Sequence, residues 1–366
     1  MSKAARIIAF HLPQFHPTPE NDEWWGKGFT EWTNVAKAKP LFAGHYQPHI
    51  PADLGFYDLR LPEARHAQSE LAKEYGIEGF CYYHYWFGNG RRLLERPVNE
   101  ILSSGEPDFP FCLCWANHSW NNIWQGVADR MLMEQTYPGM DDHKEHFEWL
   151  LNAFKDRRYI TVDDMPLFLI FNPGEIPDLP DVLSYWRQLA VEAGLKGLYL
   201  VGVNYRFRAD WDPRSVGLDA STWQPLPPKD GHIPSNFFGE KIKRFFSKTK
   251  SRVTVHHYAA VINMLIRKSP PPFPDYPTVL PNWDNTPRSG ENGLVFHEST
   301  PELFRSLLRR AFSLIKHYEP EKRIIFIKAW NEWAEGNYLE PDQKYGHGYL
   351  QVIKEELGAS SLEDNK

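Results

Sequence analysis

Eight apolar runs recur along the chain, and most are continuous in apolar residues instead of alternating with polar ones. Strands buried on both faces show this pattern, because each side of such a strand meets protein. The runs predict strands over residues 6–11, 78–86, 110–117, 166–171, 198–204, 220–224, 278–285 and 323–333. The sixth of these runs, ASTWQ, is the shortest and has the weakest pattern.

Between the runs lie segments with apolar residues three and four positions apart, as in amphipathic helices. These segments predict helices over residues 62–76, 141–156, 180–194 and 300–318. Strand followed by helix, repeated about eight times, predicts an α/β fold of the (β/α)8 TIM-barrel type with long βα-loops. A doubly wound open sheet is the alternative. We expect residues 1–358 to form this single domain and residues 359–366 a polar C-terminal tail.

A long stretch separates the sixth and seventh predicted strands, at about residues 225–277. It opens with PLPP and closes with SPPPFPDYP, which predicts an insertion bounded by prolines. Residues 236–268 within it hold eight Lys or Arg and one Glu. We favour a solvated helix face as the explanation. The alternative is peripheral contact with a polyanion, such as membrane lipid phosphates, a nucleotide or an anionic glycan.

Composition narrows the class of protein. The chain has 366 residues, 42% of them hydrophobic, which is enough for a large core. No apolar run is long enough to cross a bilayer, and the start MSKAARIIAFHLPQFHP lacks a signal-peptide core, so we expect a cytoplasmic protein. The net charge of −6 argues against nucleic-acid binding. The three cysteines lie within apolar runs and predict buried free thiols.

Polar and aromatic residues gather where the predicted strands end. In barrels of this type the active site lies at the carboxyl ends of the strands. Aromatic residues make up 15% of the chain, with 14 Trp, and aromatic faces beside amides suit sugar rings. The candidate substrate-binding residues are His11, Gln14, Tyr83, His84, Trp86, Trp115, Asn117, His118, Asn172, Asn204, Trp223, Trp283, Asp284, Arg288, Trp330 and Asn331. The spacing of the histidines does not form a metal site, and we expect no metal and no cofactor.

The stretch KAWNEWAEGNYLEP, at the end of the eighth predicted strand, holds Glu332 and Glu335. Gly336 and Asn337 break the strand pattern, so the chain can curl and bring both carboxylates to the barrel mouth. Two carboxylates that flank a scissile bond are what glycoside hydrolysis requires, one as acid and one as base or nucleophile. The alternative is that Glu332 forms a structural salt bridge with Arg288 or Lys328.

Several stretches carry a family resemblance. AWNEWAEGNYLEP resembles the carboxylate motif of glycoside hydrolase family 99, the endo-α-mannosidase and endo-α-mannanase group. The stretches AFHLPQFHPTPENDEWWGKGFTEWTNV, HYQPHIPADLGFYDLR, GIEGFCYYHYWF, CWANHSW and WDNTPR resemble the WbsX-type family of polysaccharide biosynthesis proteins, which are labelled glycosyltransferases. Together they cover almost the whole chain. The long HPTPENDEWWGKGFTEW loop departs from family 99 and leaves the substrate open.

The resemblance implies roles for the two glutamates. Glu332 would act as base on the sugar 2-hydroxyl, which gives an epoxide-like intermediate, and Glu335 as acid and then base at the leaving oxygen and at water. The usual retaining scheme makes one carboxylate a covalent nucleophile instead, and the sequence does not separate the two.

Three functions follow from these observations. The first is a retaining, endo-acting glycoside hydrolase or transglycosidase on α-linked mannose-like or deoxyhexose units of a bacterial surface polysaccharide, in O-antigen or lipopolysaccharide metabolism. The second is a glycosyltransferase of lipopolysaccharide or O-antigen biosynthesis with a nucleotide- or lipid-linked donor, although the sequence has no Gly-rich phosphate loop. The third is a non-catalytic glycan-binding barrel. In each case the expected partner is an oligo- or polysaccharide.

Overall fold

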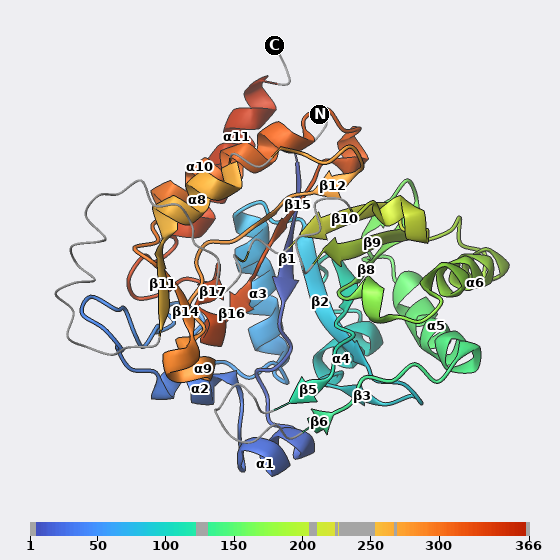
Figure 1. Cartoon of the computed structure of the whole chain (residues 1–366), viewed down its shortest axis with the longest axis horizontal. Coiled ribbons are helices and arrows are strands. Elements are labelled where there is room, and N and C mark those ends of the chain that lie inside the picture. Colours follow the sequence, from blue (N-terminus) through green and yellow to red (C-terminus); the bar gives the residue numbers. More distant parts are fainter. Residues whose placement is uncertain are drawn as a thin grey trace.

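The computed structural model describes residues 5–121, 131–204, 211–223, 226, 253–266 and 269–363, the side chains of residues 204 and 361–363 excepted. Parallel strands form a central barrel with helices outside it (Figure 1). These strands are β1 (Arg6–His11), β2 (Gly79–Trp86), β4 (Phe111–Trp115), β8 (Met165–Ile170), β9 (Tyr199–Asn204), β10 (Ala220–Trp223), β12 (Asp275–Tyr276), β13 (Thr278–Val279) and β15 (Ile324–Ile327).

The barrel closes through one strand that is broken at Pro277. On one side of the break β12 pairs with β10, and on the other side β13 pairs with β15, which in turn pairs with β1. Proline has no N–H to donate to a ladder, so the run from 275 to 279 reads as two short strands. The Pro277 carbonyl still accepts from the Phe326 amide at 3.0 Å. The predicted α/β TIM barrel is therefore confirmed.

Helices cover the outside of the barrel, and shorter elements decorate its ends. The helices are α1 (Pro19–Trp25), α2 (Glu31–Lys37), α3 (Pro62–Glu74), α4 (Arg96–Ser104), α5 (Met140–Phe154), α6 (Leu179–Glu192), α8 (Tyr258–Ile266), α9 (Thr286–Ser289), α10 (Pro301–Ile315) and α11 (Gly348–Glu363). The short strands are β3 (Arg92–Leu93), β5 (Trp120–Asn121), β6 (Met131–Met133), β7 (Thr161–Val162), β11 (Thr254–His257), β14 (Leu294–His297), β16 (Asn331–Glu332) and β17 (Asn337–Tyr338). The strands β1 and β2 point toward the end of the barrel where α1, α2, α9 and the β5–β6 hairpin lie (Figure 1).

The predicted strands agree with the structure except near the site. The sixth strand, predicted from the weakest pattern, is present as β10. The seventh begins at Asp275 and ends at Val279, earlier than residues 278–285; Pro281 follows, and Asp284 pairs instead with Val295. The eighth ends at Ile327 instead of near residue 333, and the chain beyond it forms a separate β16–β17 hairpin.

The stretch predicted as an insertion contributes a barrel helix. Helix α8 buries Tyr258, Val261, Ile262 and Leu265 and packs beside α10. Its apolar face fills the place of the helix after the sixth strand. Most of the basic segment 236–268 lies outside the described residues. At the other end of the chain, α11 runs into the segment expected as a polar tail.

Two further expectations concern cysteines and membranes. Cys81, Cys112 and Cys114 are buried free thiols, as predicted. None of the helices within the described ranges is both long and apolar enough to span a bilayer.

Candidate active site

The two glutamates of the KAWNEWAEGNYLEP stretch lie on a small hairpin just beyond β15. Glu332 ends β16, and Glu335 ends a short 3-10 helix, Trp333–Glu335. The Asn331 amide group fixes this hairpin to the end of β1, because its Oδ1 accepts from the Leu12 N–H at 2.7 Å and its Nδ2 donates to the Leu12 carbonyl at 3.0 Å. The glutamates are thereby held at the carboxyl ends of the barrel strands.

Gly336 lets the hairpin turn. Its φ of +59° is left-handed, a conformation that disfavours side chains. A Cβ at this position would also lie 2.8 Å from Cβ of Asp284. Glycine is therefore required here for two reasons, and the turn sets the direction in which Glu335 points.

Three carboxylates and two cations meet beside this hairpin, and we call Glu31, Arg288, Lys328, Glu332 and Glu335 the charged cluster. The Arg288 guanidinium donates to Glu335 at 2.7 Å and lies 2.9 Å from Glu31 and 3.4 Å from Glu332. The Lys328 ammonium lies 3.3 Å from Glu332 and 3.7 Å from Glu335.

The shared cations place the two glutamates close to one another. Since the same Lys328 Nζ contacts one oxygen of each carboxylate, those two oxygens can be no farther apart than the two contact distances together. The ion pairs predicted as the alternative for Glu332 are present with both Arg288 and Lys328. Arg288 and Lys328 each contact both glutamates, so these ion pairs keep the two carboxylates near one another at the strand ends.

Electrostatics and exposure together describe the carboxylates of the cluster. Burial, and then the charge of Glu332, raises the pKa of Glu335 above its ordinary value. Burial disfavours the charged form of Lys328, but Glu332 and Glu335 outweigh it and raise the pKa of that ammonium. Burial raises the pKa of Glu31 as well, with Arg288 opposing the rise. The side chain of Glu335 is 16% exposed and that of Glu332 5%, so Glu335 is the more accessible of the pair.

Several predicted substrate-binding residues surround the cluster. The Tyr83 hydroxyl lies 3.2 Å from Lys328 Nζ, and the rings of Tyr83 and Trp283 each lie 5.6 Å from this ammonium. Burial of its imidazole, and then the charge of Lys328, lowers the pKa of His118 to about 4, although part of the residue is exposed. With Arg288, these are the predicted residues whose side chains lie at the charged cluster.

Three predicted aromatic residues point the other way, toward helix α5 and its neighbours. His84 stacks on Trp149 and lies 2.8 Å from Nε2 of His146. Trp86 donates to Asp142, and Trp115 donates to the Trp86 carbonyl and packs against Trp186. Side chains alternate along a strand, so Tyr83 faces the barrel interior while His84 and Trp86 face the helices.

A second group of predicted residues belongs to a buried network behind the hairpin. His11 pairs with Gln68 at 3.1 Å, and Gln68 donates to Glu340 at 2.7 Å. Glu340 also accepts from Tyr57 at 2.9 Å and from Trp333 at 2.5 Å. The ring of Trp330 packs against Phe80. Gln14 is not part of this network: it donates to Asn21 of α1 at 3.4 Å, and its carbonyl accepts from the Glu31 N–H at 3.2 Å. The bonds of Glu340 to Gln68, Tyr57 and Trp333 hold the hairpin to the rest of the barrel.

The buried carboxyl of Glu340 gives the protein a pH-dependent stability. Burial raises its pKa from 4.5 to about 7. Below pH 4.5 the Glu340 carboxyl is protonated in both the folded and the unfolded chain. Between pH 4.5 and about 7 the unfolded chain releases this proton while the folded chain keeps it. The contribution of Glu340 to the free energy of unfolding therefore falls as the pH rises toward about 7. We expect this contribution of Glu340 to be about 3 kcal/mol, measured as the difference in pH dependence between wild type and Glu340→Gln, because buried histidines such as His11 and His84, whose pKa burial lowers, act in the opposite direction in both proteins. Urea unfolding at about pH 5 and about pH 8 measures it.

The control for this measurement is Glu63→Gln, on the exposed first turn of α3. It should keep the wild-type dependence on pH. A Glu340→Gln protein with that same dependence would contradict the assignment of the titration to Glu340.

The remaining predicted residues hold loops together. Asn117 donates to the Asn172 carbonyl at 2.8 Å and accepts from its N–H at 2.7 Å, which joins the ends of β4 and β8. Asp284 is buried and accepts from His45 and Gln47, each at 2.7 Å. Trp223 is buried at the end of β10. The side chain of Asn204, which ends β9, lies outside the described residues.

Three residues near the glutamates were not among the predicted binding residues: Glu31, Lys328 and Tyr85. Lys328 could have been predicted as a site residue, because it is a charged residue directly after the buried strand β15. Tyr85 lies on the same face of β2 as Tyr83, and the charges of Glu332 and Arg288 act on its hydroxyl. Glu31 stands at the first position of α2, far from the glutamates in sequence, and no local pattern points to it.

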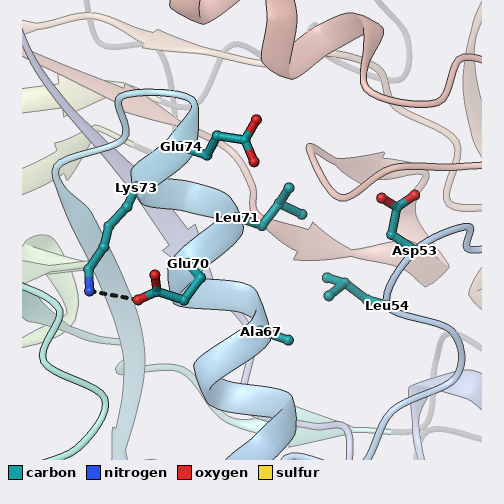
Figure 2. A pocket seen from close by; sticks show the side chains of 7 residues that line it. All are labelled: Asp53, Leu54, Ala67, Glu70, Leu71, Lys73 and Glu74. Carbon is teal, nitrogen blue, oxygen red and sulfur yellow. Dashed lines mark hydrogen bonds and ion pairs between the residues drawn. The ribbon is translucent and has the colours of Figure 1, made fainter.

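An open hollow of about 600 Å³ lies elsewhere, beside α3. Figure 2 shows Leu54 and Leu71 facing one another across it, with Asp53 and Glu74 above and the Lys73–Glu70 ion pair to the side. It shares no residue with the charged cluster, so it is separate from the candidate site. In the part of the chain that the structure describes, no group of three metal-ligating side chains occurs.

Comparison with known families bears on this geometry. A family model described as glycosyltransferase WbsX matches residues 7–353. The chain belongs to the WbsX glycosyltransferase family. The protein WxcX of Xanthomonas campestris pv. campestris (strain B100) is 37% identical over 355 residues, which are 96% of this chain and 50% of the relative. The chain thus spans about half the length of this curated relative.

Solved structures share the fold of this WbsX-family chain. A glycoside hydrolase-like protein, at 18% identity, matches with a TM-score of 0.59 and covers 96% of this chain and 94% of its own. The family 99 endo-α-mannosidase of Bacteroides thetaiotaomicron, at 12% identity, matches with a TM-score of 0.56 over 99% and 98%. At these identities the likeness concerns the fold. Membership of the WbsX family, which is described as glycosyltransferase, indicates a carbohydrate-active enzyme.

Proposed function

We propose that the protein is a retaining, endo-acting glycoside hydrolase or transglycosidase. Its substrate would be α-linked mannose-like or deoxyhexose units of a bacterial surface polysaccharide, and its site of action the cytoplasm. The observation that carries the proposal is the pair of carboxylates, Glu332 and Glu335, held beside one another by Arg288 and Lys328. The endo-α-mannosidase activity named for the structural relative supports the substrate class.

In this proposal the glutamates divide the work of acid and base. Glu335, with its raised pKa and greater exposure, protonates the leaving glycosidic oxygen and then takes a proton from the incoming water or sugar hydroxyl. Glu332 lies between two cations that offset its charge, and it acts at the anomeric side of the sugar. It either attacks the anomeric carbon or removes the proton of the 2-hydroxyl.

Tyr83, Trp283 and His118 would line the subsite of the sugar being cleaved. Tyr83 and Trp283 flank the Lys328 ammonium, so an aromatic surface adjoins the charges. Aromatic rings contact the C–H face of a sugar while charged groups bind its hydroxyls. Arg288, which contacts all three carboxylates, fixes the spacing of the catalytic pair.

The second candidate function is a glycosyltransferase that uses a nucleotide- or lipid-linked donor. The description of the matching family as glycosyltransferase favours it. Phosphates of such a donor would meet a cluster with three carboxylates and two cations, which is unfavourable for an anion. The basic segment 236–268, most of which lies outside the described residues, would be the partner for a membrane or anionic glycan in either case.

Product analysis separates these functions. Wild type and Glu335→Gln are incubated with extracted surface polysaccharide and lipid-linked oligosaccharides, without nucleotide sugar, and the products are measured by mass spectrometry. Shortened or rearranged glycans from wild type alone are the expected result. Chain extension that occurs only after nucleotide sugars are added would support the transferase and contradict the proposal.

A further inference from the structure

A second polar pocket adjoins the hairpin on the flank of the barrel. It has a volume of about 200 Å³ and lies between residues 44–49, 295–299 and 336–349. None of the five residues of the charged cluster lines it. We call it the flank pocket and define it by His49, Asn282, Asp284, Tyr338, Asp342 and Tyr349.

The floor of the flank pocket is buried and already hydrogen bonded. The Tyr338 hydroxyl lies 2.7 Å from Asp342 and 2.8 Å from Nδ1 of His49. The Tyr349 hydroxyl lies 2.7 Å from Ser299. Asp342, His49 and Tyr338 are each more than nine-tenths buried. These bonds hold the polar groups in fixed positions before any ligand arrives, which lowers the entropic cost of binding.

The rim of the flank pocket is aromatic and exposed to solvent. Lys344 is exposed, and its ammonium lies 4.5 Å from the ring centre of Tyr46 and 4.8 Å from that of Tyr345. Glu298 is also exposed, and its backbone has a φ of +61°, a strained value for glutamate. A ligand can therefore enter from solvent and pass between aromatic faces to the polar floor.

One buried polar atom in this pocket has no partner. The side-chain oxygen of Asn282 is shielded from solvent and accepts no hydrogen bond. Leaving such an acceptor unpaired costs about 1–3 kcal/mol, which a ligand donor would recover. The lining of the flank pocket thus includes an unpaired acceptor, which a ligand hydroxyl can reach if the Asn282 side chain turns into the pocket.

The charges of the pocket select the class of ligand. Asp284, Asp342 and Glu298 are carboxylates, and Lys344 is the lysine that lines the pocket. An excess of carboxylates repels phosphates and other anions. Paired donors and acceptors below, with aromatic faces above, match the hydroxyls and the C–H face of a neutral sugar. The volume is on the scale of one sugar ring.

A shared wall connects the flank pocket with the charged cluster. Asp284, which lines the pocket, donates its backbone N–H to the Glu335 carbonyl at 2.6 Å. Gly336, which follows Glu335 in the chain, also lines the pocket and packs against Asp284. The pocket and the proposed acid therefore lie on two sides of one short segment.

We propose that the flank pocket binds a neutral sugar residue of the glycan, outside the catalytic centre. The choice of a sugar rests on the proposed function, while the pocket itself rests on its own residues. Such a site would hold the polysaccharide to the enzyme beside the bond that is cut.

Binding of monosaccharides tests the proposal. Methyl α-mannoside, methyl α-rhamnoside and methyl α-N-acetylglucosaminide are titrated into the full chain, and saturation-transfer-difference NMR reports the contact. We expect at least one of them to bind wild type and Glu335→Gln with the same affinity, and Asn282→Ala about tenfold more weakly. Lys344→Ala, an exposed substitution at the rim, should also weaken binding. Inorganic phosphate should not compete.

The matched control is Asn152→Ala, an exposed position of α5 away from the pocket, which should bind as wild type does. Melting temperatures show whether each variant is folded. Unchanged binding in both Asn282→Ala and Lys344→Ala, or no binding of any of the three sugars to wild type, would overturn the flank-pocket proposal. Sugar binding without any glycan cleavage would instead overturn the proposed function and leave the pocket standing.

Discussion

Replacing Glu335 with Gln is expected to lower kcat for glycan cleavage by about a thousandfold, with little change in KM. General acid–base catalysis by a positioned side chain contributes about 10²–10⁴ to a rate, and Gln keeps the shape of Glu without its proton. Burial and the adjacent Glu332 favour the protonated form of Glu335, and its side chain is more exposed than that of Glu31, whose pKa burial also raises. Steady-state kinetics on the polysaccharide identified by product analysis measure this loss.

The dependence of this effect on pH and on the leaving group identifies the role of Glu335. An acid must be protonated, so wild-type activity should fall as pH rises through the raised pKa of Glu335, and this alkaline limb should vanish in Glu335→Gln. An aryl glycoside with a good leaving group needs little protonation, so its first cleavage step should be lowered far less. Equal losses on both substrates would contradict an acid role.

The control for the kinetic experiment is Glu63→Gln on the exposed face of α3. Its kcat should stay within about twofold of wild type, because surface substitutions away from special features have small effects. A Glu335→Gln protein that keeps a comparable rate would remove Glu335 from the mechanism.

Replacing Arg288 with Gln is expected to destabilise the fold by about 3–5 kcal/mol and to abolish cleavage. The guanidinium is the group that contacts Glu31, Glu332 and Glu335 together. Without it Glu332 and Glu335 keep their contacts with Lys328, while Glu31 loses the cation it is paired with, and breaking a buried ion pair by removing one partner costs about this much. Urea unfolding, followed by circular dichroism, measures the loss.

The pH dependence of the Arg288→Gln variant tests the electrostatic cause. Carboxylates that lose their cation have higher pKa values in the folded state, so the loss of stability should be larger at about pH 8 than at about pH 5. The exposed Arg157→Gln, which breaks a surface pair with Asp108, should cost less than about 1 kcal/mol. A loss in Arg288→Gln that does not vary with pH would point to packing as its origin.

The strands could be predicted from the sequence, but the directions of their side chains could not. In β2 every residue is buried, so apolar and aromatic residues occupy both faces and no alternation marks which one faces the interior. Tyr83 and His84 are therefore equal candidates in the sequence. In the structure one contacts Lys328 and the other contacts His146.

The charged cluster was predictable in part for a related reason. Glu332 and Glu335 stand in one short motif, and the strand before them directs them to the barrel end. Glu31 comes from α2 and Arg288 from α9, and only the closure of the barrel brings these helices together. Arg288 and Glu31 are more than 250 residues apart in the sequence, so no local pattern could predict that they form an ion pair.

The break at Pro277 makes the barrel unequal around its circumference. The ladders on its two sides, β10–β12 and β13–β15, contain two residue pairs each, whereas β2–β4 contains five. Among the barrel strands, those at this seam have the fewest ladder hydrogen bonds. We therefore expect their amide protons to exchange earliest and the sheet to open locally there first. The hairpin that carries the glutamates follows β15. On its side away from the seam, β15 pairs with β1 through four residue pairs. Local opening at the seam would therefore leave the β1–β15 side, which anchors the glutamates, paired.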